Sequence, residues 1–181
     1  MRTSVPHIFA VGDCAETKEF FTGKCVPIML AFTACYEARI AGINVNKKSQ
    51  FIKNNGTFTC FLTSINGLML GSVGLNEECI HKKVVVGISQ CYSHHPESLL
   101  DTHLIKVKLI FSKPRGMLIG GQVMEPESAG KIVNILALAI QKQATVHDLS
   151  TLQIATHPLL TPAPTVYPLV TATQSALSKF K

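Results

Sequence analysis

Short apolar runs, some alternating with polar residues as strands do, recur between residues 57 and 124. Residues 104–111, Leu-Ile-Lys-Val-Lys-Leu-Ile-Phe, alternate as a half-buried strand does. Asn66-Gly67 is a strong signal for a tight hairpin, and residues 113–116, Lys-Pro-Arg-Gly, mark a second turn. Together with the other runs rich in apolar and β-branched residues, these signals predict five strands, at 57–62, 68–73, 84–89, 104–111 and 117–124.

Other segments favour helices. Residues 28–45 present an apolar, small-residue surface with stop signals at Gly42 and Asn44, and residues 128–143 carry an apolar stripe. The stripe residues expected to be buried are Ile132, Val133, Ile135, Leu136, Ala139 and Ile140. Shorter helical or irregular pieces are expected at 77–83 and 146–149, an extended proline-rich loop at 159–168 and a closing helix at 170–180.

Hairpin-linked strands followed by helices predict an α+β fold, with a five-stranded antiparallel sheet and flanking helices. The pattern changes at the polar segment 46–50, so we place a boundary there, between residues 1–45 and 50–181. The 181 residues are 46% hydrophobic and 15% charged, which is typical of a globular domain. No apolar run is long enough to span a membrane, and the N-terminus does not resemble a signal peptide.

Charge and cysteine spacing exclude several classes of partner. The net charge is +6, but the basic residues are dispersed, whereas a nucleic-acid face needs a clustered stripe. The six cysteines form no C-x-x-C pair and no zinc-site spacing, which favours reduced, mostly buried thiols in a cytoplasmic protein. His94-His95, Glu97 and His103 fit no regular metal-site spacing. We therefore expect no metal, no nucleic acid and no membrane partner.

The N-terminal segment carries the strongest functional signal. An apolar run, Ile8–Val11, stops at Gly12-Asp13, as a buried strand ends where backbone and a carboxylate approach a ligand. The alternative is that Asp13 only caps a turn.

Residues 3–13 resemble the second FAD-contacting motif of the pyridine nucleotide–disulfide oxidoreductases. The rest of the chain is similar to the interface domain of the same family, with landmarks in the same order, most closely in the NADH oxidase and coenzyme A–disulfide reductase branch. These landmarks are Gly71 with Gly74-Leu75, the hairpin from 108–111 to 118–122, the helix with 135–140, and residues 144–149.

The resemblance implies a larger flavoenzyme that uses FAD and NAD(P)H and forms a homodimer. Residues 1–45 would be the end of its FAD-binding domain, and 50–181 its dimerisation domain. Gly12 and Asp13 would approach the flavin ribityl chain. Leu30, Ala31 and Thr33 would belong to a helix start directed at the flavin ring, although Met29 stands where proline is common.

His157-Pro158 resembles the Ala-His-Pro segment by which the glutathione-reductase branch places a histidine in the partner's active site. Pro162 replaces the glutamate that orients this histidine in that branch, and Thr156 replaces a tyrosine common in the coenzyme A–disulfide reductase branch. We therefore expect His157 to assist catalysis, with its bond to Pro158 a candidate for the cis form. The alternative is a packed loop histidine.

The sequence thus predicts the C-terminal dimerisation part of an FAD-dependent NAD(P)H oxidoreductase. Electrons would pass from nicotinamide through the flavin to oxygen or a disulfide. No G-x-G-x-x-G fingerprint is present, so this chain alone is expected to be inactive. The alternative is a freestanding, non-enzymatic protein-interaction module.

Overall fold

The computed structural model describes residues 1–46, 51–80, 83–98 and 101–180. The chain forms two compact units, Met1–Thr59 and Cys60–Lys181. Most of the polar segment 46–50, where the sequence placed a boundary, lies outside the described residues. The division into residues 1–45 and 50–181 stays a prediction.

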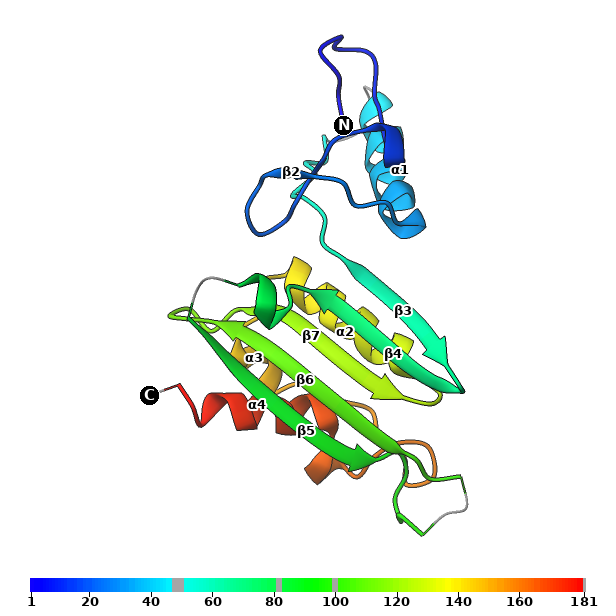
Figure 1. Cartoon of the computed structure of the whole chain (residues 1–181), viewed down its shortest axis with the longest axis vertical. Coiled ribbons are helices and arrows are strands. Elements are labelled where there is room, and N and C mark those ends of the chain that lie inside the picture. Colours follow the sequence, from blue (N-terminus) through cyan, green and yellow to red (C-terminus); the bar gives the residue numbers. More distant parts are fainter. Residues whose placement is uncertain (47–50, 81–82, 99–100, 181) are drawn as a thin grey trace. The chain divides into compact units, whose positions relative to one another are not determined.

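The second unit is built on one antiparallel sheet (Figure 1). Its five strands lie in the order β3-β4-β7-β6-β5, as the sequence predicts for this fold class. Asn66 and Gly67 join β3 to β4 with φ angles of 49° and 77°, which are the positive values of a type I′ hairpin turn. The strands are β3 (Cys60–Ile65), β4 (Leu68–Gly74), β5 (Val84–Tyr92), β6 (Leu104–Ser112) and β7 (Leu118–Glu125).

Two helices cover one face of this sheet. Helix α2 (Ala129–Gln141) packs on β3, β4 and β7, and α4 (Pro168–Leu177) packs on β5 and β6. A Cβ atom on Gly121 would touch Leu136 of α2, and one on Gly87 would collide with Ala172 of α4. Both glycines pair with Leu109, so they point to the same face of the sheet.

The remaining short elements of this unit are η2 (Glu77–Cys79), α3 (Val146–Ser150) and η3 (Pro164–Val166). Thr145 begins α3 with a capping box, because its hydroxyl accepts from the Asp148 N–H and Asp148 accepts from the Thr145 N–H. The expectation that Ile135 belongs to the buried stripe of α2 is wrong, since this side chain is 37% exposed. It lies on the outer surface of the helix near Leu138, which is 56% exposed.

The first unit contains η1 (Gly12–Cys14), the two-residue strands β1 (Thr17–Lys18) and β2 (Cys25–Val26), and α1 (Ala31–Val45). The buried strand expected at residues 8–11 is wrong: Phe9 forms a single bridge to Arg2, and Ile8 is 49% exposed. A buried strand needs a paired strand on each side. Among the described residues of this unit, the segment 8–11 pairs only through the bridge between Phe9 and Arg2.

Helix α1 begins at Ala31 rather than at the predicted residue 28, because Leu30 is extended, with φ −124° and ψ 133°. Its end at Val45 is the predicted one. In the part of the chain that the structure describes, no helix is both long and apolar enough to cross a membrane.

Candidate functional site

The turn at Gly12 is held against α1. Gly12 has φ +76°, a left-handed conformation that favours glycine, and a Cβ there would lie 3.3 Å from the Ala34 Cβ. The Gly12 N–H donates to Glu37 Oε2 at 3.0 Å. Ala34 and Glu37 lie one helical turn apart on α1, so this helix fixes where the turn begins.

Asp13 follows this turn and is exposed. It borders a cavity of about 330 Å³ whose other walls include Gly12, Cys25 and Met29. Among the described residues, the structure gives the Asp13 carboxylate no side-chain hydrogen bond, so its oxygens can accept from a ligand's hydroxyl groups. The structure therefore brings together Gly12, Asp13 and the chain just before α1.

The predicted residues at the helix start contribute backbone rather than side chains. Ala34 is the first residue of α1 to donate within the helix, to Leu30 O at 3.1 Å, so the N–H groups of Ala31 and Thr33 have no intrahelical acceptor. The Thr33 side chain is 3% exposed and lies with its hydroxyl 3.5 Å from that of Thr57. This hydroxyl faces the interior of the unit.

Sequence reasoning missed Glu37. It is 1% exposed, and its second oxygen, Oε1, accepts from the Thr17 hydroxyl at 2.9 Å. A signal was present, because Glu37 is the one acidic residue of α1 and lies in its otherwise apolar part. A carboxylate is costly to bury without partners, so such a position indicates a specific bonding role.

His157 lies in the second unit, in an exposed turn after α3. Its Nδ1 accepts from the Leu159 N–H at 3.2 Å, so in the neutral ring Nε2 carries the proton. The candidate cis bond at Pro158 is wrong, because the cis bonds of the described residues are His95-Pro96 and Lys113-Pro114. Trans is the more stable isomer at ordinary X-Pro bonds, and the turn closes with Thr161 N–H donating to His157 O.

A polar cavity of about 250 Å³ lies beside the segment that follows His157. Thr161, Tyr167, His94 and His103 contribute to its walls. The Pro158 carbonyl accepts from the His95 N–H at 2.9 Å, which joins the turn to the β5–β6 loop. Burial, and then the charge of Glu125, raise the pKa of Tyr167, so this phenol stays neutral well above pH 7.

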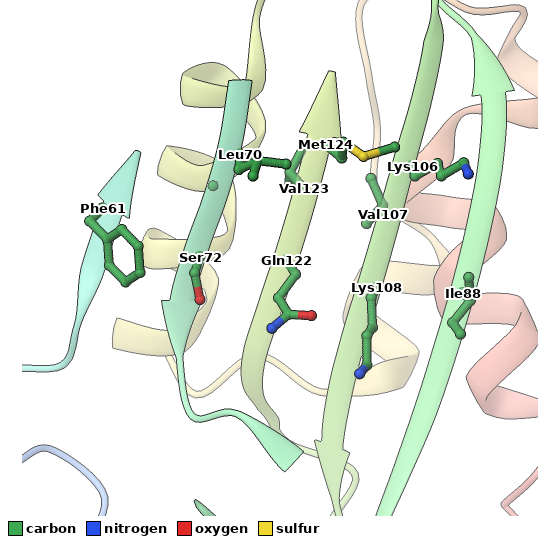
Figure 2. A pocket seen from close by; sticks show the side chains of 11 residues that line it. Phe61, Leu70, Ser72, Ile88, Lys106, Val107, Lys108, Gln122, Val123 and Met124 are labelled. Atoms are coloured by element: carbon green, nitrogen blue, oxygen red, sulfur yellow. The ribbon is translucent and has the colours of Figure 1, made fainter. Parts of the chain in front are cut away.

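Helices α2 and α4 leave the opposite face of the sheet uncovered, and this face holds a groove of about 410 Å³. Figure 2 shows Phe61, Leu70 and Met124 along it, with Lys106 and Lys108 from β6. The Lys108 ammonium pairs with Glu77. Among the residues that the structure describes, no three His, Cys, Asp or Glu side chains gather as they would around a metal ion.

Comparisons with known proteins agree with this architecture. The model of the pyridine nucleotide-disulphide oxidoreductase dimerisation domain matches residues 62–166. An NADH oxidase of Methanocaldococcus jannaschii is 27% identical over 99% of this chain, which covers 39% of that protein.

Two solved structures are similar over nearly the whole chain. The NAD-dependent persulfide reductase from A. fulgidus has a TM-score of 0.86 and 26% identity, with 99% of this chain and 33% of that chain covered. The reduced Bacillus anthracis CoADR-RHD has a TM-score of 0.84 and 28% identity, with 97% and 31% covered.

The chain thus spans between about a third and two fifths of the length of these relatives. The family predicted from residues 3–13 and from the strand and helix landmarks is confirmed, because the matched model covers more than half of the chain. The chain belongs to the pyridine nucleotide–disulphide oxidoreductase family and carries its dimerisation domain.

Proposed function

We propose that this chain is the C-terminal part of a homodimeric, FAD-dependent NAD(P)H oxidoreductase. The observation that carries the proposal is the Gly12–Asp13 turn, held by α1 and preceding a dimerisation domain of this family. A protein of this class passes electrons from a nicotinamide through the bound flavin to an acceptor such as oxygen or a disulfide.

The residues of the first unit fit a flavin nucleotide. Gly12 lets the backbone approach closely, and the Asp13 carboxylate can accept from ribityl hydroxyl groups. The free N–H groups at the start of α1 carry partial positive charge, which stabilises a negatively charged ring system. Leu30, Ala31 and Thr33 would act through this backbone.

The exposed face of α2 supports the homodimer. Ile135 and Leu138 are apolar yet 37% and 56% exposed, and Leu62 of β3 is 49% exposed. A Cβ on Gly130 of α2 would lie 3.1 Å from Leu62 Cδ1, so the strand and the helix share this surface. Leu159 and Leu160 in the proline-rich segment are also exposed, at 54% and 72%, and would extend the contact.

The direct test is to extend the reading frame upstream and to purify the protein that it encodes. The proposal requires two glycine-rich dinucleotide fingerprints, bound FAD, and reduction of that flavin by NADH or NADPH. The 181-residue chain alone should bind FAD weakly or not at all, since it supplies only one edge of the site. A frame with neither fingerprint would favour a non-enzymatic interaction module instead.

A further inference from the structure

We propose that Glu37 is a positioning residue for the candidate flavin site, which sets the place of Asp13 through the backbone of Gly12. The inference rests on the proposed function for its ligand. Its structural part, the control of the Gly12 turn by Glu37, can be tested on this chain alone.

The first step is the unusual environment of the carboxylate. Glu37 is 1% exposed, and the ion pairs of the described residues, His103–Glu125 and Lys108–Glu77, do not include it. Burying a carboxylate without a cation is costly unless hydrogen bonds compensate. The two hydrogen bonds that Glu37 accepts must therefore compensate its burial, and an apolar residue here would leave the Gly12 N–H and the Thr17 hydroxyl without this acceptor.

The second step is what the two oxygens hold. Oε2 accepts from the Gly12 N–H at 3.0 Å, and Oε1 accepts from the Thr17 hydroxyl at 2.9 Å. Glu37 therefore joins both ends of the segment 12–17 to α1. Asp13, Cys14 and Glu16, which lie between these two anchors, are exposed.

The third step is that α1 supplies both halves of the candidate site. The φ of +76° favours glycine at position 12, where a Cβ would lie 3.3 Å from that of Ala34, and Glu37 orients its N–H. The same helix presents its free N–H groups at Ala31 and Thr33. Because Glu37 ties the turn to this helix, the Asp13 carboxylate and the helix start keep one fixed spacing, as recognition of a rigid ligand requires.

The experiment compares Glu37→Leu, which keeps volume but removes both acceptors, with Glu37→Gln, which keeps one acceptor oxygen. The matched control is Ile40→Ala, a 6% exposed residue on the same helix whose loss weakens packing without touching Gly12. Amide hydrogen exchange is measured by NMR on this chain. In Glu37→Leu, exchange at the Gly12 amide should become about tenfold faster relative to exchange at the Ile40 amide. Ile40→Ala should accelerate both amides alike.

In the longer flavoenzyme, Glu37→Leu should weaken FAD binding about tenfold, and Glu37→Gln by less than about threefold. Unchanged Gly12 exchange in Glu37→Leu would overturn the inference. It would also be overturned if Ile40→Ala, at the same loss of stability, weakened FAD binding as much as Glu37→Leu does. If Gly12 exchange responds while FAD affinity is insensitive to both Glu37→Leu and Asp13→Asn, the assignment of the flavin site fails, and the positioning role fails with it.

Discussion

The imidazole Nε2 of His103 lies 3.6 Å from Oε2 of the fully buried Glu125. The other oxygen of Glu125 accepts from the Ser128 hydroxyl at 2.7 Å. His103 immediately precedes β6, Glu125 ends β7, and Ser128 precedes α2, so one carboxylate links three elements. Neither His103 Nε2 nor Glu125 Oε2 has a hydrogen-bond partner within the described residues, so the two atoms form an ion pair only when the imidazole is protonated.

Loss of His103 should therefore destabilise the second unit. His103→Ala would remove the polar group that lies nearest to the buried Glu125 Oε2, and should lower the free energy of unfolding by about 1–3 kcal/mol. Glu127→Ala, at an exposed neighbouring carboxylate, should change it by less than about 0.5 kcal/mol. Urea denaturation followed by circular dichroism measures both. Equal effects of the two substitutions would show that the pair contributes nothing specific.

Cys91 should be the least reactive of the free thiols whose exposure is described. Burial, and then the charges of Glu125 and Glu97, raise its pKa to about 11. The expectation that the thiols are mostly buried is wrong, because Cys14, Cys25 and Cys35 are exposed. At pH 8 a maleimide should therefore label these three first. Mass spectrometry of the labelled peptides decides the order, and early labelling of Cys91 in the folded protein would contradict the prediction.

The same shift has a consequence for stability at high pH. The pKa of Cys91 is raised from 9.0 to about 11, so the folded state retains the thiol proton over a range in which the unfolded chain has lost it. Its contribution to stability is full below about pH 9 and is lost as pH rises towards 11. Cys91→Ala should therefore flatten the fall in thermal midpoint between these pH values, and an unchanged slope would exclude Cys91 as its cause.

Self-association should depend on the outer surface of α2. Leu138→Lys places a charge in the proposed contact and should shift the chain towards the monomer, measured by light scattering at micromolar to millimolar concentration. Ile88→Lys is the matched control, because Ile88 is 60% exposed on the helix-free face of the sheet. A wild-type chain that is already monomeric over this range, or a larger effect of Ile88→Lys, would place the contact elsewhere.

Asp13 should be required for flavin occupancy in the longer enzyme. Asp13→Ala removes acceptor oxygens at the edge of the cavity and should lower the fraction of purified protein that carries FAD. Glu127→Ala changes an exposed acid that does not line this cavity and should leave occupancy close to wild type. The ratio of flavin absorbance to protein absorbance gives the answer, and full occupancy of Asp13→Ala would remove this carboxylate from the site.

The sheet could be predicted from the sequence because its signals are local. Strand periodicity, Asn66-Gly67 and the stripe on α2 each act over a few residues, and the five predicted runs match the five strands. The prediction of a strand at 8–11 is wrong because strand pairing is not a local property. The apolar residues of this segment are suited to a sheet, but pairing depends on partners that local sequence does not reveal.

The buried polar contacts could not be predicted in the same way. Glu37 reaches Gly12 across 25 positions, which no helical or strand spacing predicts. Glu125 lies near His103 because Lys106 pairs with Met124 in the β6–β7 hairpin, but the register shift between Ile110 and Phe111 hides this pairing from the sequence. Ile135 shows a further limit, since an apolar residue at the border of a helical stripe can be exposed. The roles proposed for Gly12 and Asp13 rest on the resemblance to a family, and composition alone suggests none.

His157 should assist turnover in the longer enzyme without being essential. Its Nε2 is free to exchange a proton with a bound substrate, because Nδ1 accepts from the Leu159 N–H. Pro162 stands where a glutamate orients the corresponding histidine in the glutathione-reductase branch, so no carboxylate from that position tunes this ring. His157→Ala should therefore lower turnover about tenfold, below the 10²–10⁴ typical of a well-positioned acid–base group.

His157→Gln, which retains a hydrogen-bonding side chain but cannot titrate, is the control. Steady-state kinetics with FAD occupancy measured in parallel would reveal an essential histidine as complete loss of activity with flavin still bound. Unchanged turnover in both variants would leave His157 as a turn residue held by Leu159 and Thr161.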